Sequence, residues 1–257
     1  MIDLHCHYLP DVDDGARDLQ EAIALIKLAV KDGATDIVLT PHVYAGRWDN
    51  TLATLQPRFD AFSRLIASKQ LPVTLYLGAE VHLQPETIDL VERRQVPFVG
   101  HWNGDPAILL ELHDGRIPPF ALAAVRHLRS LGVVPIIAHP ERNKAVMSAV
   151  DCIEPFVAAG CLLQLTAASV AGRFGAVAER TAFRLIDRGW AHFIGSDAHN
   201  LLHRPPMLRA ARRVLRERYG QDVATAMTRS VPEQLIEPRR TGGAGLVLDD
   251  RAVAIGS

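Results

Sequence analysis

Nine side chains able to bind a metal stand where short apolar runs of the sequence end. They are His5, His7, His42, His139 and His199, together with Asp14, Glu80, Glu111 and Asp197. His5 and His7 are two residues apart, so in a strand both side chains point the same way and Cys6 points away. Nine such groups are too many for one ion. The sequence therefore predicts a centre of two or three divalent ions.

The ligand types indicate the metal, and two arginines indicate the substrate. Imidazoles mixed with carboxylates suit manganese or iron, with zinc and magnesium as alternatives. Paired divalent ions can activate a water molecule and hold the leaving oxygen of an in-line displacement. Arg142 and Arg204 follow two of the same runs, and a guanidinium group matches phosphate oxygens. Together these features predict hydrolysis of a phosphate ester.

Other hydrolytic mechanisms lack their residues. A cysteine-dependent phosphatase needs a Cys-x5-Arg motif, but Val12, Ala158 and Ala167 stand at the arginine position after the three cysteines. No GxSxG elbow and no P-loop is present, so neither a thiol nor a serine nucleophile is supported. The cysteines show no CxxC spacing, which argues against a disulfide framework or a structural zinc site.

The elements that would position these residues alternate along the chain. Apolar runs typical of buried strands cover residues 2–6, 36–39, 74–78, 107–111, 134–138, 161–165 and 192–195. Amphipathic segments typical of helices cover residues 19–31, 52–68, 119–131, 151–159, 178–188, 206–219 and 222–228. Such alternation predicts a parallel α/β sheet with crossover helices. Seven repeats favour a closed barrel, whose active site would lie after the strands, over an open doubly wound sheet.

Composition sets further expectations. The 257 residues carry 28 Lys and Arg against 29 Asp and Glu, so no basic surface for nucleic acid is expected. We expect no membrane insertion and no signal peptide, and therefore a cytoplasmic protein, because no long apolar run is present. Residues 1–237 are expected to form one catalytic barrel, with residues 238–257 as a loosely attached, glycine-rich tail.

The order of the motifs resembles the polymerase-and-histidinol-phosphatase (PHP) superfamily. Within it, the chain is similar to the manganese-dependent tyrosine phosphatases of bacterial capsule and exopolysaccharide operons. The shared motifs are His5-Cys6-His7, Asp11-Val12-Asp13-Asp14-Gly15, Thr40-Pro41-His42, Gly78-Ala79-Glu80, Leu109-Leu110-Glu111-Leu112, Ala138-His139-Pro140-Glu141-Arg142, Ser196-Asp197-Ala198-His199-Asn200 and Arg204-Pro205-Pro206. They appear in this order over residues 1–236. Cys6 stands where many relatives carry serine.

This resemblance implies a distorted seven-stranded (β/α)7 PHP-type barrel with three metal ions, usually manganese. The ligands would be His5, His7, Glu80 and Asp197 for one ion, Glu80, Glu111 and His139 for the second, and Asp14, His42 and His199 for the third. Glu80 would bridge two ions, and Arg142 and Arg204 would be the catalytic, phosphate-binding arginines. The substrate would be phosphotyrosine in the tail of a polysaccharide co-polymerase kinase, so that the enzyme regulates polysaccharide synthesis. Members often form homo-oligomeric rings.

Three alternatives stay open. A PHP phosphoesterase could act on histidinol phosphate or another small ester, although the Asp-Val-Asp-Asp-Gly and Arg-Pro-Pro motifs favour the tyrosine phosphatase branch. A metal-dependent amidohydrolase also opens with HxH, but many carry a modified lysine where this chain has Glu111. A binding module with structural metals is the third.

Trp48, Trp102 and His113 lie in expected rim loops and could contact an aromatic substrate.

Overall fold

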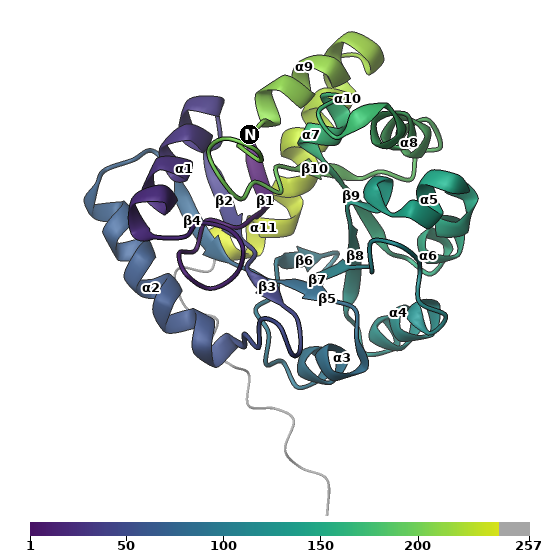
Figure 1. Ribbon diagram of the computed structural model, residues 1–257, viewed down its shortest axis with the longest axis horizontal. Helices are drawn as coiled ribbons and strands as arrows, with labels where there is room; N and C mark the ends of the chain where they lie inside the picture. The colour runs from purple at the N-terminus through teal and green to yellow at the C-terminus, as the bar shows by residue number, and fades with distance from the viewer. Residues whose placement is uncertain (242–257) are drawn as a thin grey trace, which may run out of the picture.

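The computed structural model describes the backbone of residues 1–241 and the side chains of residues 1–240. Its strands are β1 (Ile2–Cys6), β2 (Asp36–Leu39), β3 (His42–Val43), β4 (Thr74–Leu77), β5 (Glu80–His82), β6 (Gly100–Trp102), β7 (Asp105–Glu111), β8 (Val134–Ala138), β9 (Leu162–Thr166) and β10 (Phe193–Gly195). Its α-helices are α1 (Leu19–Asp32), α2 (Leu52–Ser68), α3 (Pro85–Glu92), α4 (Ala121–Ser130), α5 (Lys144–Ser148), α6 (Glu154–Ala158), α7 (Ala167–Val170), α8 (Gly175–Asp187), α9 (Leu208–Tyr219), α10 (Gln221–Thr225) and α11 (Val231–Thr241). Short segments η1 (Pro140–Arg142), η2 (Val150–Ile153) and η3 (Ala226–Ser230) join them. Strands occupy the centre and helices the outside (Figure 1).

The parallel strands follow one another around a closed path. β1 pairs with β2, and β2 pairs with β4. From β5, the continuation of β4, the path leads through β7, β8 and β9 to β10. It returns to β1 at a parallel bridge between Cys6 and Ala198. With β2 joined to β3 and β4 joined to β5, the ring has seven strands, as the sequence predicted. The antiparallel β6, paired with β7, was not predicted.

Two strands of the ring are broken, and each break leads to a predicted ligand. Two residues separate β2 from β3, and two separate β4 from β5. The second break is crowded, since a Cβ on Gly78 would lie 2.8 Å from Val38 Cγ1. β3 and β5 then pair with His42 opposite Glu80. The breaks therefore bring these two side chains together at the end of the barrel.

Apolar side chains fill both sides of the strand ring. One cluster is formed almost wholly by strand residues such as Leu4, Leu109 and Ile136, and α11 adds Leu235 to it. The larger cluster joins the other faces of the strands to the surrounding helices and contains Cys6. Strands buried on both faces explain why the sequence shows continuous apolar runs rather than alternation.

Local signals define the first two helices. Asp18 accepts a hydrogen bond from the Glu21 N–H at 2.8 Å, which satisfies a free donor at the start of α1. Gly33 ends that helix in the left-handed conformation, with φ of 105°. Thr51 and Thr54 cap the start of α2 reciprocally. Both helices lie where the sequence predicted them.

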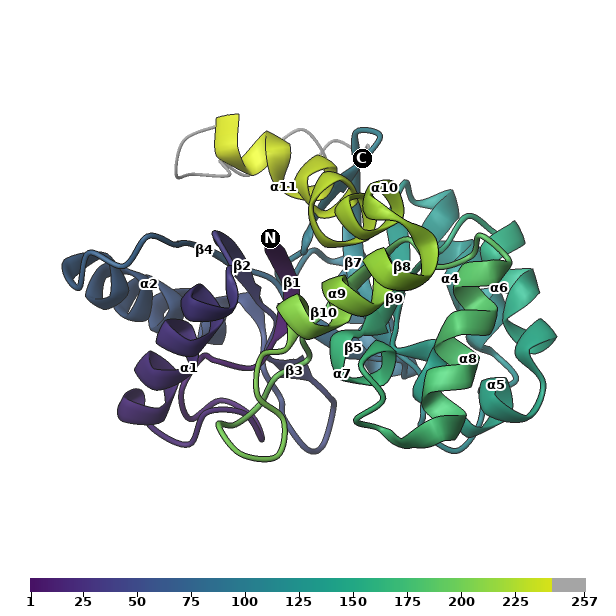
Figure 2. The same ribbon diagram turned by 90° about the horizontal axis from the view of Figure 1, so that it is seen from above.

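Helix α11 covers the end of the barrel opposite the long loops that follow β1, β3 and β10 (Figure 2). Gly100 in β6 lies against it, because a Cβ there would be 2.1 Å from the Leu235 carbonyl oxygen. Arg239 donates hydrogen bonds to the carbonyl oxygens of Leu77 and Phe98, at 2.8 and 2.7 Å. These contacts hold α11 across this end of the barrel.

The C-terminal boundary differs from the expected one. The tail predicted over residues 238–257 begins within α11, which continues to Thr241. Arg240, in this stretch, forms ion pairs of 2.5 Å with Asp36 and with Glu233. Arg239 and Arg240 therefore hold this stretch against the barrel. Residues 242–257 of the predicted tail lie outside the described residues.

Candidate metal centre

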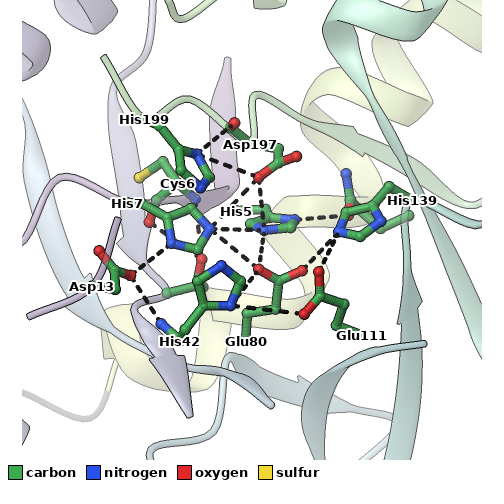
Figure 3. Close-up of polar contacts among 12 residues, drawn as sticks. His5, Cys6, His7, Asp13, His42, Glu80, Glu111, His139, Asp197 and His199 are labelled. Carbon is green, nitrogen blue, oxygen red and sulfur yellow. Dashed lines mark hydrogen bonds and ion pairs between the residues drawn. The ribbon is translucent and has the colours of Figure 1, made fainter. Parts of the chain in front are cut away.

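The first group of ligands contains both histidines of β1. His5 Nε2 lies 3.1 Å from Glu80 Oε2 and 3.3 Å from Asp197 Oδ1. His7 Nε2 lies 3.2 and 3.5 Å from the same two oxygens. Figure 3 shows the four side chains converging on one point. Atoms this close, one from each side chain, can be shared by a single cation.

A second group lies beside the first. His139 Nε2 is 2.8 Å from Glu80 Oε1 and 3.8 Å from Glu111 Oε1. Glu80 therefore presents one oxygen to each group, which is the position of a bridging carboxylate. His42 approaches the same two carboxylates, with Nδ1 3.3 Å from Glu80 Oε2 and 3.9 Å from Glu111 Oε2.

The third group is the most open. Asp14 Oδ1 lies 3.5 Å from both His42 Nε2 and His199 Nε2. The His199 ring lies beside the His7 ring, with 3.9 Å between their centres. The Asp14 side chain is 45% exposed, whereas the imidazoles are buried. All nine predicted ligands thus gather in one cluster, and His7 and His42 each border two groups.

The donor set fits divalent cations. Four buried atoms of the cluster have no hydrogen-bond partner among the described residues: His42 Nδ1, Glu80 Oε2, Asp197 Oδ1 and His199 Nε2. Burying polar atoms in this state is costly, and such atoms are rare in folded proteins. Cations bound among them would remove that cost, and the mixture of imidazole and carboxylate is chemically suited to such ions.

Two residues that the sequence did not predict as ligands, Gln164 and Asp13, orient the rings of His5 and His7. The Gln164 side-chain oxygen lies 2.9 Å from His5 Nδ1, and Asp13 Oδ2 lies 2.8 Å from His7 Nδ1. Asp13 also accepts the backbone N–H of His42 at 2.9 Å. Each contact holds the proton on Nδ1 and turns Nε2 towards the cluster, as is usual for metal-binding histidines.

The backbone around the cluster is unusually constrained. Asp197 and His139 both have positive φ, 49° and 32°, which costs a side-chain-bearing residue about 1–3 kcal/mol. β1 changes register between Asp3 and Cys6, just where its histidines begin. A Cβ on Gly15 would lie 2.0 Å from the His7 carbonyl oxygen, so only glycine allows this loop to fold onto the strand.

Electrostatics favour ionised carboxylates. Burial would raise the pKa of Glu80, but His5 and the neighbouring imidazoles hold it well below its usual value. Burial would lower the pKa of His7, but Asp13 and other carboxylates outweigh this and raise it well above its usual value. In His199, burial dominates and lowers the pKa to about 4. A metal must therefore displace a proton from His7 but not from His199.

Both predicted arginines stand at the edge of the cluster. The guanidinium groups of Arg142 and Arg204 contact Asp197 Oδ2, the oxygen that does not face the histidines. Arg142 also lies over the Phe174 ring, 4.7 Å from its centre. The two side chains are 24% and 25% exposed, and both line the cavity beside the cluster. They are thus placed to meet a ligand entering from solvent.

The cavity has a volume of about 330 Å³. Besides predicted ligands and arginines, its lining comprises Tyr44, Arg47, Trp48, His82, His113 and Asp114. Trp48 and His113 therefore lie where the sequence suggested. Trp102 does not line this cavity, because β6 carries it to the strand cluster beneath α11.

Comparison with known proteins identifies the family. A family model described as "Capsular polysaccharide synthesis, CpsB/CapC" matches residues 1–237. The chain belongs to this family. This CpsB/CapC membership confirms the resemblance to the capsule-operon branch of PHP phosphatases that the sequence motifs indicated.

Several CpsB/CapC relatives are similar over most of their length. CapC of Staphylococcus aureus is 35% identical over 81% of each chain. The tyrosine-protein phosphatase YwqE of Bacillus subtilis is 31% identical over 89% of each. The tyrosine-protein phosphatase CpsB of Streptococcus pneumoniae is 24% identical over 92% of this chain and 98% of its own.

Solved structures agree with the fold of this CpsB/CapC member. A structure from work on YwqE and CpsB, described as unique metal-dependent tyrosine phosphatases, superposes with a TM-score of 0.80, 30% identity and 93% coverage of both chains. A phosphotriesterase homology protein of Escherichia coli gives a TM-score of 0.55 at 13% identity, which shows a shared fold alone. No helix within residues 1–241 has the length and apolarity needed to cross a membrane.

Proposed function

We propose that this protein is a metal-dependent protein-tyrosine phosphatase that uses three divalent ions, with manganese as the preferred metal. The observation that carries the proposal is the gathering of nine ligand side chains in one cluster, beside a cavity that Arg142 and Arg204 line. Membership of the CpsB/CapC family supports it, as do the relatives named tyrosine-protein phosphatases.

The three groups suggest how the ions would be divided. The ligands would be His5, His7, Glu80 and Asp197 for the first, Glu80, Glu111 and His139 for the second, and Asp14, His42 and His199 for the third. Ions bound in this way would polarise the phosphoryl group and activate a water molecule for in-line displacement. The protein's own contribution is to hold the ligand atoms in place, through Gln164 and Asp13 among others.

Arg142 and Arg204 would bind the phosphoryl group. Both reach Asp197 from its outer side, and Arg204 Nε is buried without a hydrogen-bond partner among the described residues. A phosphate dianion can accept paired N–H groups from such guanidinium forks. Because charge on the phosphoryl oxygens changes as the ester bond breaks, donors fixed beforehand can stabilise the transition state more than the ground state.

The substrate we infer is phosphotyrosine on a protein, in particular the tyrosine-rich tail of a bacterial kinase that acts in polysaccharide export. Its removal would regulate capsule or exopolysaccharide synthesis, in agreement with the description of the family. A homo-oligomer belongs to the same proposal, because the resemblance to PHP-type phosphatases implies one.

The test is a comparison of three substrates on one preparation. Purified protein is assayed with a phosphotyrosine peptide, histidinol phosphate and an acyl amide, each with manganese and after chelation. The proposal expects manganese-dependent turnover that is fastest on the phosphotyrosine peptide. Faster hydrolysis of histidinol phosphate or of the amide would contradict it.

A further inference from the structure

A tight turn from Tyr44 to Trp48, called here the 44–48 turn, forms part of the cavity wall. The Tyr44 N–H donates to the Trp48 carbonyl oxygen at 2.9 Å, and the Trp48 N–H donates back to the Tyr44 carbonyl oxygen at 2.8 Å. Gly46 takes a φ of 79°, and its N–H donates to Asp49 Oδ1 at 2.7 Å. These bonds fix the place from which Arg47 extends.

Stacked rings hold the side chains of the turn. The Trp48 indole is parallel to the His42 ring, at 4.7 Å and 7°. The Arg47 guanidinium lies over that indole, 4.0 Å from its centre, and 5.9 Å from the Tyr44 ring centre. Tyr44 in turn stacks on His82, at 4.0 Å and 3°. Stacking of this kind restrains a guanidinium while leaving its charge unpaired.

Arg47 differs from the deeper arginines of the cavity because it has no anionic partner among the described residues. Arg142 and Arg204 both contact Asp197. In the described part of the chain, no carboxylate lies within ion-pair distance of Arg47, and nearby Asp49 is occupied by Gly46. Arg47 is also exposed while lining the cavity. A restrained, exposed and unpaired cation is preorganised for an anion that arrives with the substrate.

We propose that Arg47 binds the carboxylate of an acidic residue next to the phosphotyrosine of the substrate. The inference rests on the proposed function, because it requires the phosphoryl group to lie deeper, at Arg142 and Arg204. The peptide chain attached to the tyrosine then crosses the mouth of the cavity, whose edge includes Arg47. A guanidinium fork binds a carboxylate through two parallel N–H···O bonds. Arg47 thus selects the sequence around the phosphotyrosine and takes no part in the chemical step.

The test measures kcat/KM on a phosphotyrosine peptide with a neighbouring glutamate, on the same peptide with glutamine there, and on p-nitrophenyl phosphate. The wild-type protein should prefer the acidic peptide by about three- to tenfold at low salt, and less at high salt, as for an exposed charge pair. Arg47→Ala should bring the ratio of acidic to neutral peptide to about one. Arg47→Glu should reverse the charge preference. This variant should favour a peptide in which a lysine replaces the glutamate next to the phosphotyrosine.

Arg126→Ala is the matched control, because Arg126 is an exposed arginine on α4 that does not line the cavity. This variant should keep both the activity and the preference of the wild type. Manganese content and melting temperature are measured for every variant, since Trp48 connects Arg47 to His42.

Four outcomes would overturn the inference. A wild-type protein indifferent to the neighbouring charge, or an unchanged ratio in Arg47→Ala, would remove it while leaving the phosphatase proposal in place. If Arg47→Ala lowered kcat/KM for p-nitrophenyl phosphate as much as for the acidic peptide, Arg47 would act on the phosphoryl group itself. Failure of the wild-type protein on all three substrates would remove the proposed function, and this inference with it.

Discussion

Replacement of Asp13 by asparagine should weaken metal binding although Asp13 is not among the proposed ligands. Its Oδ2 accepts from His7 Nδ1 at 2.8 Å and from the His42 N–H at 2.9 Å, while Oδ1 accepts from the Gly15 N–H at 2.9 Å. Both carboxylate oxygens therefore act as acceptors. An asparagine has only one acceptor oxygen, so its NH2 group must face a donor at one of these places.

The size of the effect follows from those contacts. Asp13→Asn removes the charge that keeps the Nδ1 proton of His7 in place and misdirects one buried hydrogen bond. Loss of such an orienting partner lowers metal affinity by about 10–100-fold, or about 1.4–2.8 kcal/mol. Because His7 and His42 each border two groups of the centre, we expect weakening at more than one site.

The assay is manganese titration by calorimetry, followed by phosphotyrosine turnover at increasing manganese. Activity of Asp13→Asn should recover largely at saturating metal, since the proposed ligands and arginines are intact. Asp11→Asn is the control, because Asp11 lies in the same loop with its side chain 87% exposed. If Asp13→Asn binds manganese as tightly as Asp11→Asn does, the orienting role is refuted.

The remaining predictions concern substrate, protons and cysteines. Arg142→Ala and Arg204→Ala should keep their metal, while their kcat/KM for phosphotyrosine should fall by about 10–1000-fold. Asp197→Ala should instead lose metal, and elemental analysis of the three variants measures the difference. Manganese binding should release protons and should tighten as pH rises, because the pKa of His7 is raised and its proton must leave before the metal binds. Calorimetry in two buffers of different ionisation enthalpy measures the protons released. Replacing all three cysteines with serine should leave most activity, and a loss of about 100-fold or more in folded protein would indicate a thiol nucleophile.

Much of the centre was visible in the sequence because parallel barrels bring the ends of all their strands to one rim. His5, Glu111 and His139 each lie at or near the end of an apolar run, so the barrel fold alone brings them together. The backbone at His139 was not predictable in this way. Its positive φ depends on the turn into η1 and on the packing around it.

The orienting residues were hidden for a different reason. Gln164 lies inside a fully buried strand, and only the folded ring of strands shows that its side chain reaches His5. Asp13 stands next to Asp14, and the spacing alone does not show that Asp13 contacts His7 Nδ1 while Asp14 contacts His42. The stacking of Arg47 on Trp48 depends on how a short turn folds back, which no periodic pattern records.

We propose that phosphotyrosine hydrolysis by this protein depends on a three-ion centre. The most direct test of this dependence measures manganese per chain by elemental analysis and phosphotyrosine turnover on the same samples, as metal is returned to chelated protein. We expect no turnover without metal, and a rise to the maximum as the metal content approaches three ions per chain. Full turnover in metal-free protein, or a maximum reached with a single bound ion, would contradict it.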